Sequence, residues 1–194
     1  MNFLAHFYLS NFNEALIVGN FIADSVKGKQ FEHFPKDIQK GILLHRQIDE
    51  FTDKHAIVMK TKESLRIKHG KFSPVISDII YDHFLASNWE KYSAVPLKSY
   101  SHSIYRTLGK NILLLPLNAQ ITYTYMVKNN WLYNYAQHEG ISKALKGISK
   151  RTNYSNNMHE APLTLLENYD EYQQHFFDFF PELIAFTENI KMRL

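Results

Sequence analysis

Apolar residues recur at intervals of three and four along almost the whole chain, and this spacing is typical of helices that each bury one face. Stretches that alternate apolar and polar residues, which would indicate strands, are missing. The pattern therefore predicts an all-α bundle. We expect helices at residues 13–27, 35–53, 55–69, 73–90, 97–114, 117–135, 138–150 and 162–190.

The residues at the ends of these segments support the same interpretation. Pro35, Pro74 and Pro96 stand at the starts of helical segments, where the fixed φ of proline suits the first turn. No repeat, low-complexity run or obvious linker divides the chain. Because 194 residues suffice for one hydrophobic core, we expect a single helical domain over residues 1–194.

Composition excludes several classes of protein. The net charge of +3 suits an anionic partner but is too weak, without a dense basic block, to indicate nucleic-acid binding. The absence of cysteine excludes disulfides, thiolate metal ligands and a cysteine nucleophile. No apolar run approaches the roughly 18 residues of a membrane span, and the first residues do not resemble a signal peptide. We expect a soluble cytoplasmic protein.

The segment GILLHRQIDEFTDKH carries ionisable side chains at helical spacing. His45, Asp49 and Asp53 recur every four residues, so each is rotated by only about 40° from the one before. An imidazole and a carboxylate one turn apart can bind one divalent metal ion. A solvated helix face explains the same spacing, and the segment alone favours that interpretation. Asp53 fits it best.

A second pair of carboxylates, Asp78 and Asp82, lies one turn apart in SPVISDIIYDHFLASNWE. This segment is apolar on most sides, which predicts a central helix. Burying two like charges is costly unless hydrogen bonds or a cation neutralise them, and a metal ion would do so. His83 points about 100° away from Asp82, toward a cavity rim or the core.

Two more polar residues stand among apolar neighbours, Asp24 in GNFIADSVKG and His6 in MNFLAHFYLS. Alone, a histidine on an apolar face is more often a hydrogen-bonded core residue, but imidazoles and carboxylates recur throughout the first 82 residues. Mixed His/Asp sites favour Mn²⁺, Mg²⁺ or Fe²⁺ over structural zinc. Such an ion lowers the pKa of bound water and polarises phosphoryl oxygens, so the residues predict metal-assisted hydrolysis of a phosphate ester.

The same segments resemble hallmark segments of the acyl carrier protein phosphodiesterase family, and the resemblance covers about residues 1–151. Further matching stretches are DIIYDHFLASNWEKYS, PLKSYSHSIYRTL and NNWLYNYAQHEGISKALKGISKR. The family is described as a divergent branch of the HD-domain phosphohydrolases, so the resemblance implies an HD-like helical fold and a divalent metal, above all Mn²⁺. In place of a His-Asp pair this sequence has the reverse order, Asp82-His83.

The resemblance also implies a reaction and a partner. The reaction is hydrolysis of the phosphodiester that joins 4′-phosphopantetheine to a serine of holo-acyl carrier protein, and the partner is this acidic protein. Six basic residues near the expected site are candidates for guiding it. They are Lys27, Lys29, Arg46, Arg66, Lys68 and Lys71.

Spacing and resemblance together give eight candidate site residues. The expected metal ligands are His45, Asp49, Asp78 and Asp82, with His6 and Asp24 completing the cluster. The expected catalytic residues are Asp24, Asp53 and His83. Two alternatives stay open: an HD-like hydrolase of nucleotides or other small phosphoesters, and a non-catalytic helical binding protein whose carboxylates are structural.

Overall fold

The structure, a computed structural model, describes residues 1–194 apart from the side chain of residue 151. Its described residues form helices and connecting turns without any strand, which confirms the all-α prediction. The α-helices are α1 (Phe3–Leu9), α2 (Glu14–Ile22), α3 (Lys36–Lys54), α4 (Ala56–His69), α5 (Ser73–Ser87), α6 (Leu97–Lys110), α7 (Leu117–Lys128), α8 (Trp131–Asn134), α9 (His138–Arg151), α10 (Ala161–Glu167) and α11 (Tyr169–Lys191).

Several expectations about helix extent were wrong, and four of them show why. Helix α1 was not predicted, because seven residues are too few to show a period. The segment 13–27 leaves the α-helix after Ile22 and continues as a 3₁₀ turn, η1 (Ala23–Ser25). The segment 117–135 is interrupted at Asn130, whose φ of 46° is left-handed. The segment 162–190 is interrupted at Asn168, which lies outside helical geometry at φ −125° and ψ 25°.

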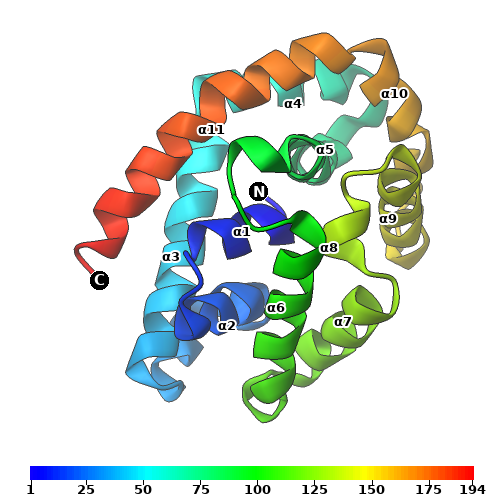
Figure 1. Cartoon of the computed structure of the whole chain (residues 1–194). Coiled ribbons are helices and arrows are strands. Elements are labelled where there is room, and N and C mark those ends of the chain that lie inside the picture. The colour runs from blue at the N-terminus through cyan, green and yellow to red at the C-terminus, as the bar shows by residue number, and fades with distance from the viewer.

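Helix α1 lies near the centre of the molecule (Figure 1). It packs against α2 and α5, while α11 runs along α3, α4 and α5 on the outer side. Helices α7, α8 and α9 form the opposite edge in the same view. One continuous hydrophobic core, which includes Leu4, Ile42, Ile80 and Phe176, connects these elements.

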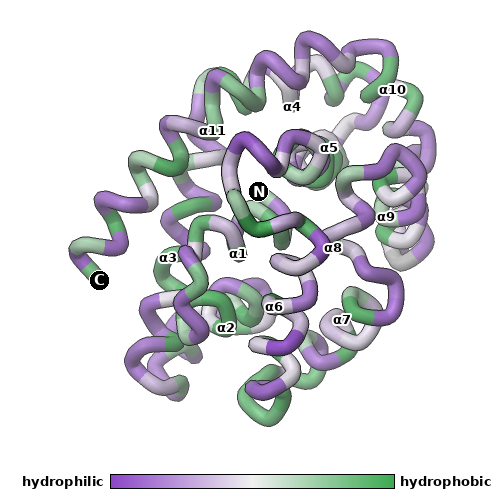
Figure 2. The backbone as a smooth tube through the Cα atoms, viewed as in Figure 1, coloured by the Kyte–Doolittle hydropathy of each residue, from purple (hydrophilic) through white to green (hydrophobic). Residues whose placement is uncertain are grey.

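Most outer helices bury only one face. Hydrophilic and hydrophobic residues alternate in short stretches along α4, α9 and α11 (Figure 2), as expected for amphipathic helices. None of the helices that the structure describes is both long and apolar enough to span a lipid bilayer.

Two glycines allow α2 and α3 to approach closely. A Cβ atom on Gly19 would lie 2.3 Å from the carbonyl oxygen of Ile38 and 2.6 Å from the Cα of Gly41. Side chains do not tolerate such distances, so only glycine fits at this crossing. The close approach brings the end of α2 and the following η1 turn against the middle of α3, where the polar residues of that helix lie.

The crossing gives a test of stability. Replacing Gly41→Ala places a Cβ 2.8 Å from both the Cα of Gly19 and the carbonyl oxygen of Leu16. We expect the free energy of unfolding to fall by about 1–3 kcal/mol, because backbone cannot yield as a flexible side chain does. Urea denaturation followed by circular dichroism measures the change.

The matched control is Gly147→Ala, which adds a Cβ in open space within α9. There alanine should raise the free energy of unfolding by about 0.5–1 kcal/mol, because glycine is the poorer helix former. Equal effects of the two substitutions would contradict the tight crossing.

Candidate metal centre

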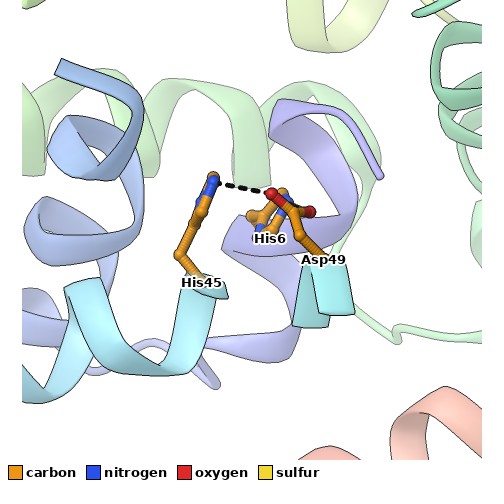
Figure 3. A group of neighbouring side chains, drawn as sticks. All are labelled: His6, His45 and Asp49. Atoms are coloured by element: carbon orange, nitrogen blue, oxygen red, sulfur yellow. Dashed lines mark hydrogen bonds and ion pairs between the residues drawn. The ribbon is translucent and has the colours of Figure 1, made fainter. Parts of the chain in front are cut away.

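Three side chains from helices α1 and α3 meet in one cluster. His6 comes from α1, and His45 and Asp49 come from α3, one turn apart. Their ligand atoms all lie within 4.8 Å of one another, and Figure 3 shows the side chains converging. The two oxygens of Asp49 divide between the imidazoles, since Oδ1 lies 3.1 Å from Nε2 of His6 and Oδ2 lies 3.0 Å from Nε2 of His45. The rings stack with centroids 4.0 Å apart.

A hydrogen-bond chain determines which nitrogen of His6 carries the proton. The hydroxyl of Ser10 donates to the carbonyl oxygen of His6, and the amide nitrogen of Asn20 donates to the Oγ of Ser10. The amide oxygen of Asn20 therefore faces Nδ1 of His6, at 3.1 Å. Since an amide oxygen only accepts, Nδ1 carries the proton and Nε2 presents its lone pair to Asp49.

The contact between His6 and Asp49 is one that a cation would stabilise. Burial and the neighbouring His45 lower the pKa of His6 to about 4, so its ring is neutral near pH 7. Its lone pair then faces a carboxylate oxygen, which is repulsive unless a positive ion lies between them. Two imidazole nitrogens and a carboxylate form a donor set suited to a divalent metal, so the described residues fit one.

His45 and Asp49 each stabilise the charged form of the other. Burial opposes a charge on His45, but hydrogen bonds with Asp24 and Asp49 outweigh it and raise the pKa of His45 to about 9. Burial likewise raises the pKa of Asp49, but the hydrogen bond from His45 outweighs it and holds that pKa well below its usual range. Nδ1 of His45 is buried without a partner among the described residues, so Nε2 carries the proton that the two carboxylates accept.

Asp24 stands at the solvent edge of the cluster. It lies in η1 (Ala23–Ser25), and its Oδ1 is 3.3 Å from Nε2 of His45. This hydrogen bond lowers the pKa of Asp24. Its side chain is 79% exposed, against 38% for Asp49, so Asp24 is the carboxylate of the cluster that is most open to water.

Asp78 lies next to the cluster on α5. The amino group of Met1 lies 3.2 Å from Asp78 and 3.6 Å from Asp49, so it joins the two carboxylates. Burial raises the pKa of Asp78 in spite of the positive charge on that amino group.

Asp82 faces the start of α1 instead of the cluster. Its fully buried carboxylate accepts hydrogen bonds from the backbone nitrogens of Leu4 at 2.7 Å and Ala5 at 3.1 Å. These are amides that a helix leaves unpaired at its start, and Asn2 makes no side-chain cap for them. Burial outweighs these bonds and raises the pKa of Asp82 to about 7. Asp82 therefore holds α1, and with it His6, in place.

Two sequence candidates make their contacts elsewhere. Asp53 accepts a hydrogen bond of 2.6 Å from Lys62. Nδ1 of His83 lies 2.8 Å from the carbonyl oxygen of Tyr135, and burial lowers the pKa of His83. Sequence reasoning missed Asn20, although a polar side chain among the apolar residues of GNFIADSVKG was a signal of the same kind as Asp24.

Comparison with known proteins identifies the family. The family model described as "Acyl carrier protein phosphodiesterase" matches residues 1–183. The chain belongs to this family. The chain is similar to the acyl carrier protein phosphodiesterase of Photorhabdus laumondii, with 29% identity over 192 residues, which are 97% of this chain and 96% of that protein. It is 30% identical to the protein of the same name from Salmonella newport over 189 residues, 95% of this chain and 96% of the other. No solved structure matches the chain, so the HD-like fold stays a prediction.

The role of Asp82 is testable without metal or substrate. Replacing Asp82→Ala leaves two buried backbone N–H groups unpaired, at a cost of about 1–3 kcal/mol each. We expect the free energy of unfolding of the metal-free protein to fall accordingly in urea denaturation. Asp82→Asn keeps one acceptor oxygen and should lose less. An Asp82→Ala variant as stable as the wild type would show that Asp82 does not cap α1.

Proposed function

We propose that this protein is a metal-dependent phosphodiesterase that removes 4′-phosphopantetheine from the serine of holo-acyl carrier protein, in the cytoplasm. Water adds across the bond between phosphorus and the serine oxygen. Phosphorus gains the hydroxyl and the serine oxygen gains the proton, so the products are 4′-phosphopantetheine and apo-carrier protein. The observation that carries the proposal is that ligand atoms of His6, His45 and Asp49 lie within 4.8 Å of one another, in a chain of this family.

His6, His45 and Asp49 would hold the metal. Asp24 and Asp78 are two further carboxylates close by. Asp24 contacts His45 directly, and Asp78 is joined to Asp49 through the amino group of Met1. We favour Mn²⁺, with Mg²⁺ and Fe²⁺ as the other candidates, because imidazole and carboxylate are mixed and thiolate is absent. When bound, the ion supplies Lewis acidity toward the phosphodiester and its attacking water.

Other side chains of the site orient the imidazoles and the attacking water. Asp49 orients His45 by accepting a hydrogen bond from its Nε2, and Asn20 holds His6 in the tautomer that leaves Nε2 free. Asp24 is exposed beside His45, so it can accept a hydrogen bond from the attacking water and orient it. Asp53 and His83 have no part in this proposal, since their polar atoms contact other groups.

The proposal predicts the effect of removing one ligand. Chelator-treated wild type should release the prosthetic group from holo-carrier protein only after Mn²⁺ is added, as loss of its mass in mass spectrometry. Asp49→Ala should abolish both the release and the Mn²⁺ content of the purified protein, measured by plasma mass spectrometry. Asp37→Ala is the matched control, because Asp37 is an exposed carboxylate on the same helix and should leave both unchanged.

Other outcomes separate the alternatives. Hydrolysis of a nucleotide, with no release from the carrier protein, would replace the proposed substrate by a small phosphoester. A wild type that binds no divalent metal and hydrolyses neither substrate would favour the non-catalytic binding protein.

Asn20 gives a second prediction. Asn20→Leu removes the acceptor that keeps the proton on Nδ1 of His6, while preserving most of the side-chain volume. Affinity for Mn²⁺ should fall by about 10–100-fold in calorimetric titration, the usual cost of losing such a supporting hydrogen bond. The exposed Asn118→Leu serves as the control. Unchanged affinity in Asn20→Leu would remove the role given to Asn20.

A further inference from the structure

Positive charge is concentrated in one part of the chain. Residues 97–151, which run from α6 through α9, contain eight Lys and Arg but a single acidic residue, Glu139. Their net charge is +7, whereas the other residues together carry −4. Such an asymmetry points to an anionic partner on this side of the molecule.

The lysines of α9 share one face. Lys143, Lys146 and Lys150 follow one another at spacings of three and four residues, so they lie on one side of the helix, and all are exposed. Lys143 pairs with Glu139 at 2.8 Å. Among the described residues, Lys146 and Lys150 make no ion pair, so both charges are available to a partner.

The basic residues expected earlier to guide a partner are less available. Arg46 donates to the carbonyl oxygens of Val26 and Gly28. Lys68 pairs with Glu167, and Lys71 lies over the ring of Tyr154 at 3.6 Å. Three of those six side chains are therefore held by local contacts.

A cavity of about 510 Å³ opens beside the lysine face, between the start of α1 and helices α7, α8 and α9. Phe3, Trp131 and Ile148 give it apolar walls, and Asn2 and Asn134 add amide groups. A lining of apolar surface with a few polar groups suits a ligand that alternates methyl and amide groups, as a phosphopantetheine arm does.

The first residues of the chain place the cavity close to the metal centre. The amino group of Met1 contacts Asp49 and Asp78, and the two residues that follow it, Asn2 and Phe3, line the cavity. Since two residues span at most about 7 Å, the cavity begins close to the carboxylates. Figure 1 shows the N-terminus in this position, between α3 and the α8–α9 edge.

Apolar residues on α7 complete the surface. Leu117, Ile121 and Tyr125 recur at four-residue spacing and are 71%, 49% and 51% exposed. Tyr125 also lines the cavity. An apolar patch bordered by a polar rim is the usual arrangement of a protein-binding surface.

We propose that an acidic carrier protein docks on the lysine face of α9 and the neighbouring α7, and that its prosthetic arm passes through this cavity to the metal centre. The inference rests on the proposed function for the nature of the arm. Charge complementarity selects the partner, since the surface carries almost no acidic residue of its own.

Charge reversal tests the docking surface. In the double variant Lys146→Glu and Lys150→Glu, we expect KM for holo-carrier protein to rise about tenfold or more, with kcat within twofold of wild type, because the charges act on encounter and binding. Raising the salt concentration should weaken the wild type and have less effect on the variant. The matched control reverses two exposed lysines of other helices, Lys36→Glu on α3 and Lys60→Glu on α4, and should keep the wild-type KM.

Binding of apo-carrier protein, measured by calorimetry, separates docking from catalysis. The wild type and the control should bind it equally well. The double variant Lys146→Glu and Lys150→Glu should bind it more weakly, by a factor similar to the rise in KM. Wild-type binding that depends on these lysines, without release of the arm, would sink the proposed reaction and keep the docking surface. Three results would overturn the docking surface. The wild type and the Lys146→Glu, Lys150→Glu double variant could bind equally well, the control could be weakened as much as the double variant, or the wild type could fail to bind.

Discussion

The rest of the site depends on the contacts that the carboxylate of Asp49 makes with two histidines. This carboxylate is the group of α3 that meets histidines from two helices at once, through 3.1 Å and 3.0 Å contacts with His6 and His45. With His6 neutral and its proton directed at Asn20, this contact brings together a lone pair and a negative charge. The fold thus holds an arrangement that a cation stabilises.

Several features outside the cluster maintain this arrangement. Asp82 pairs the first amides of α1, which keeps His6 in position. The glycine crossing of α2 and α3 brings Asn20 and Asp24 within reach of the two imidazoles. Carboxylates that resemble one another in the sequence therefore have different roles, since Asp78 lies next to the cluster and Asp82 supports the helix that carries His6.

Local spacing made part of this predictable. That His45 and Asp49 share a face follows from residues one turn apart on one helix, and the all-α class follows from the same period. The pairing of α1 with α3 did not follow, because it depends on tertiary packing of a helix too short to show periodicity. Nor could spacing separate Asp78 from Asp82, since both sit one turn apart on an apolar helix. What distinguishes them is the partner that each meets across the core.

The central claim is that His6, His45 and Asp49 bind one divalent metal. The most direct measurement is a crystal structure of Mn²⁺-loaded protein with anomalous diffraction at the manganese edge. The account predicts an anomalous peak within about 2.0–2.6 Å of Nε2 of His6, Nε2 of His45 and a carboxylate oxygen of Asp49. No peak, or a peak at other residues with Nε2 of His45 still bonded to Asp24, would contradict it.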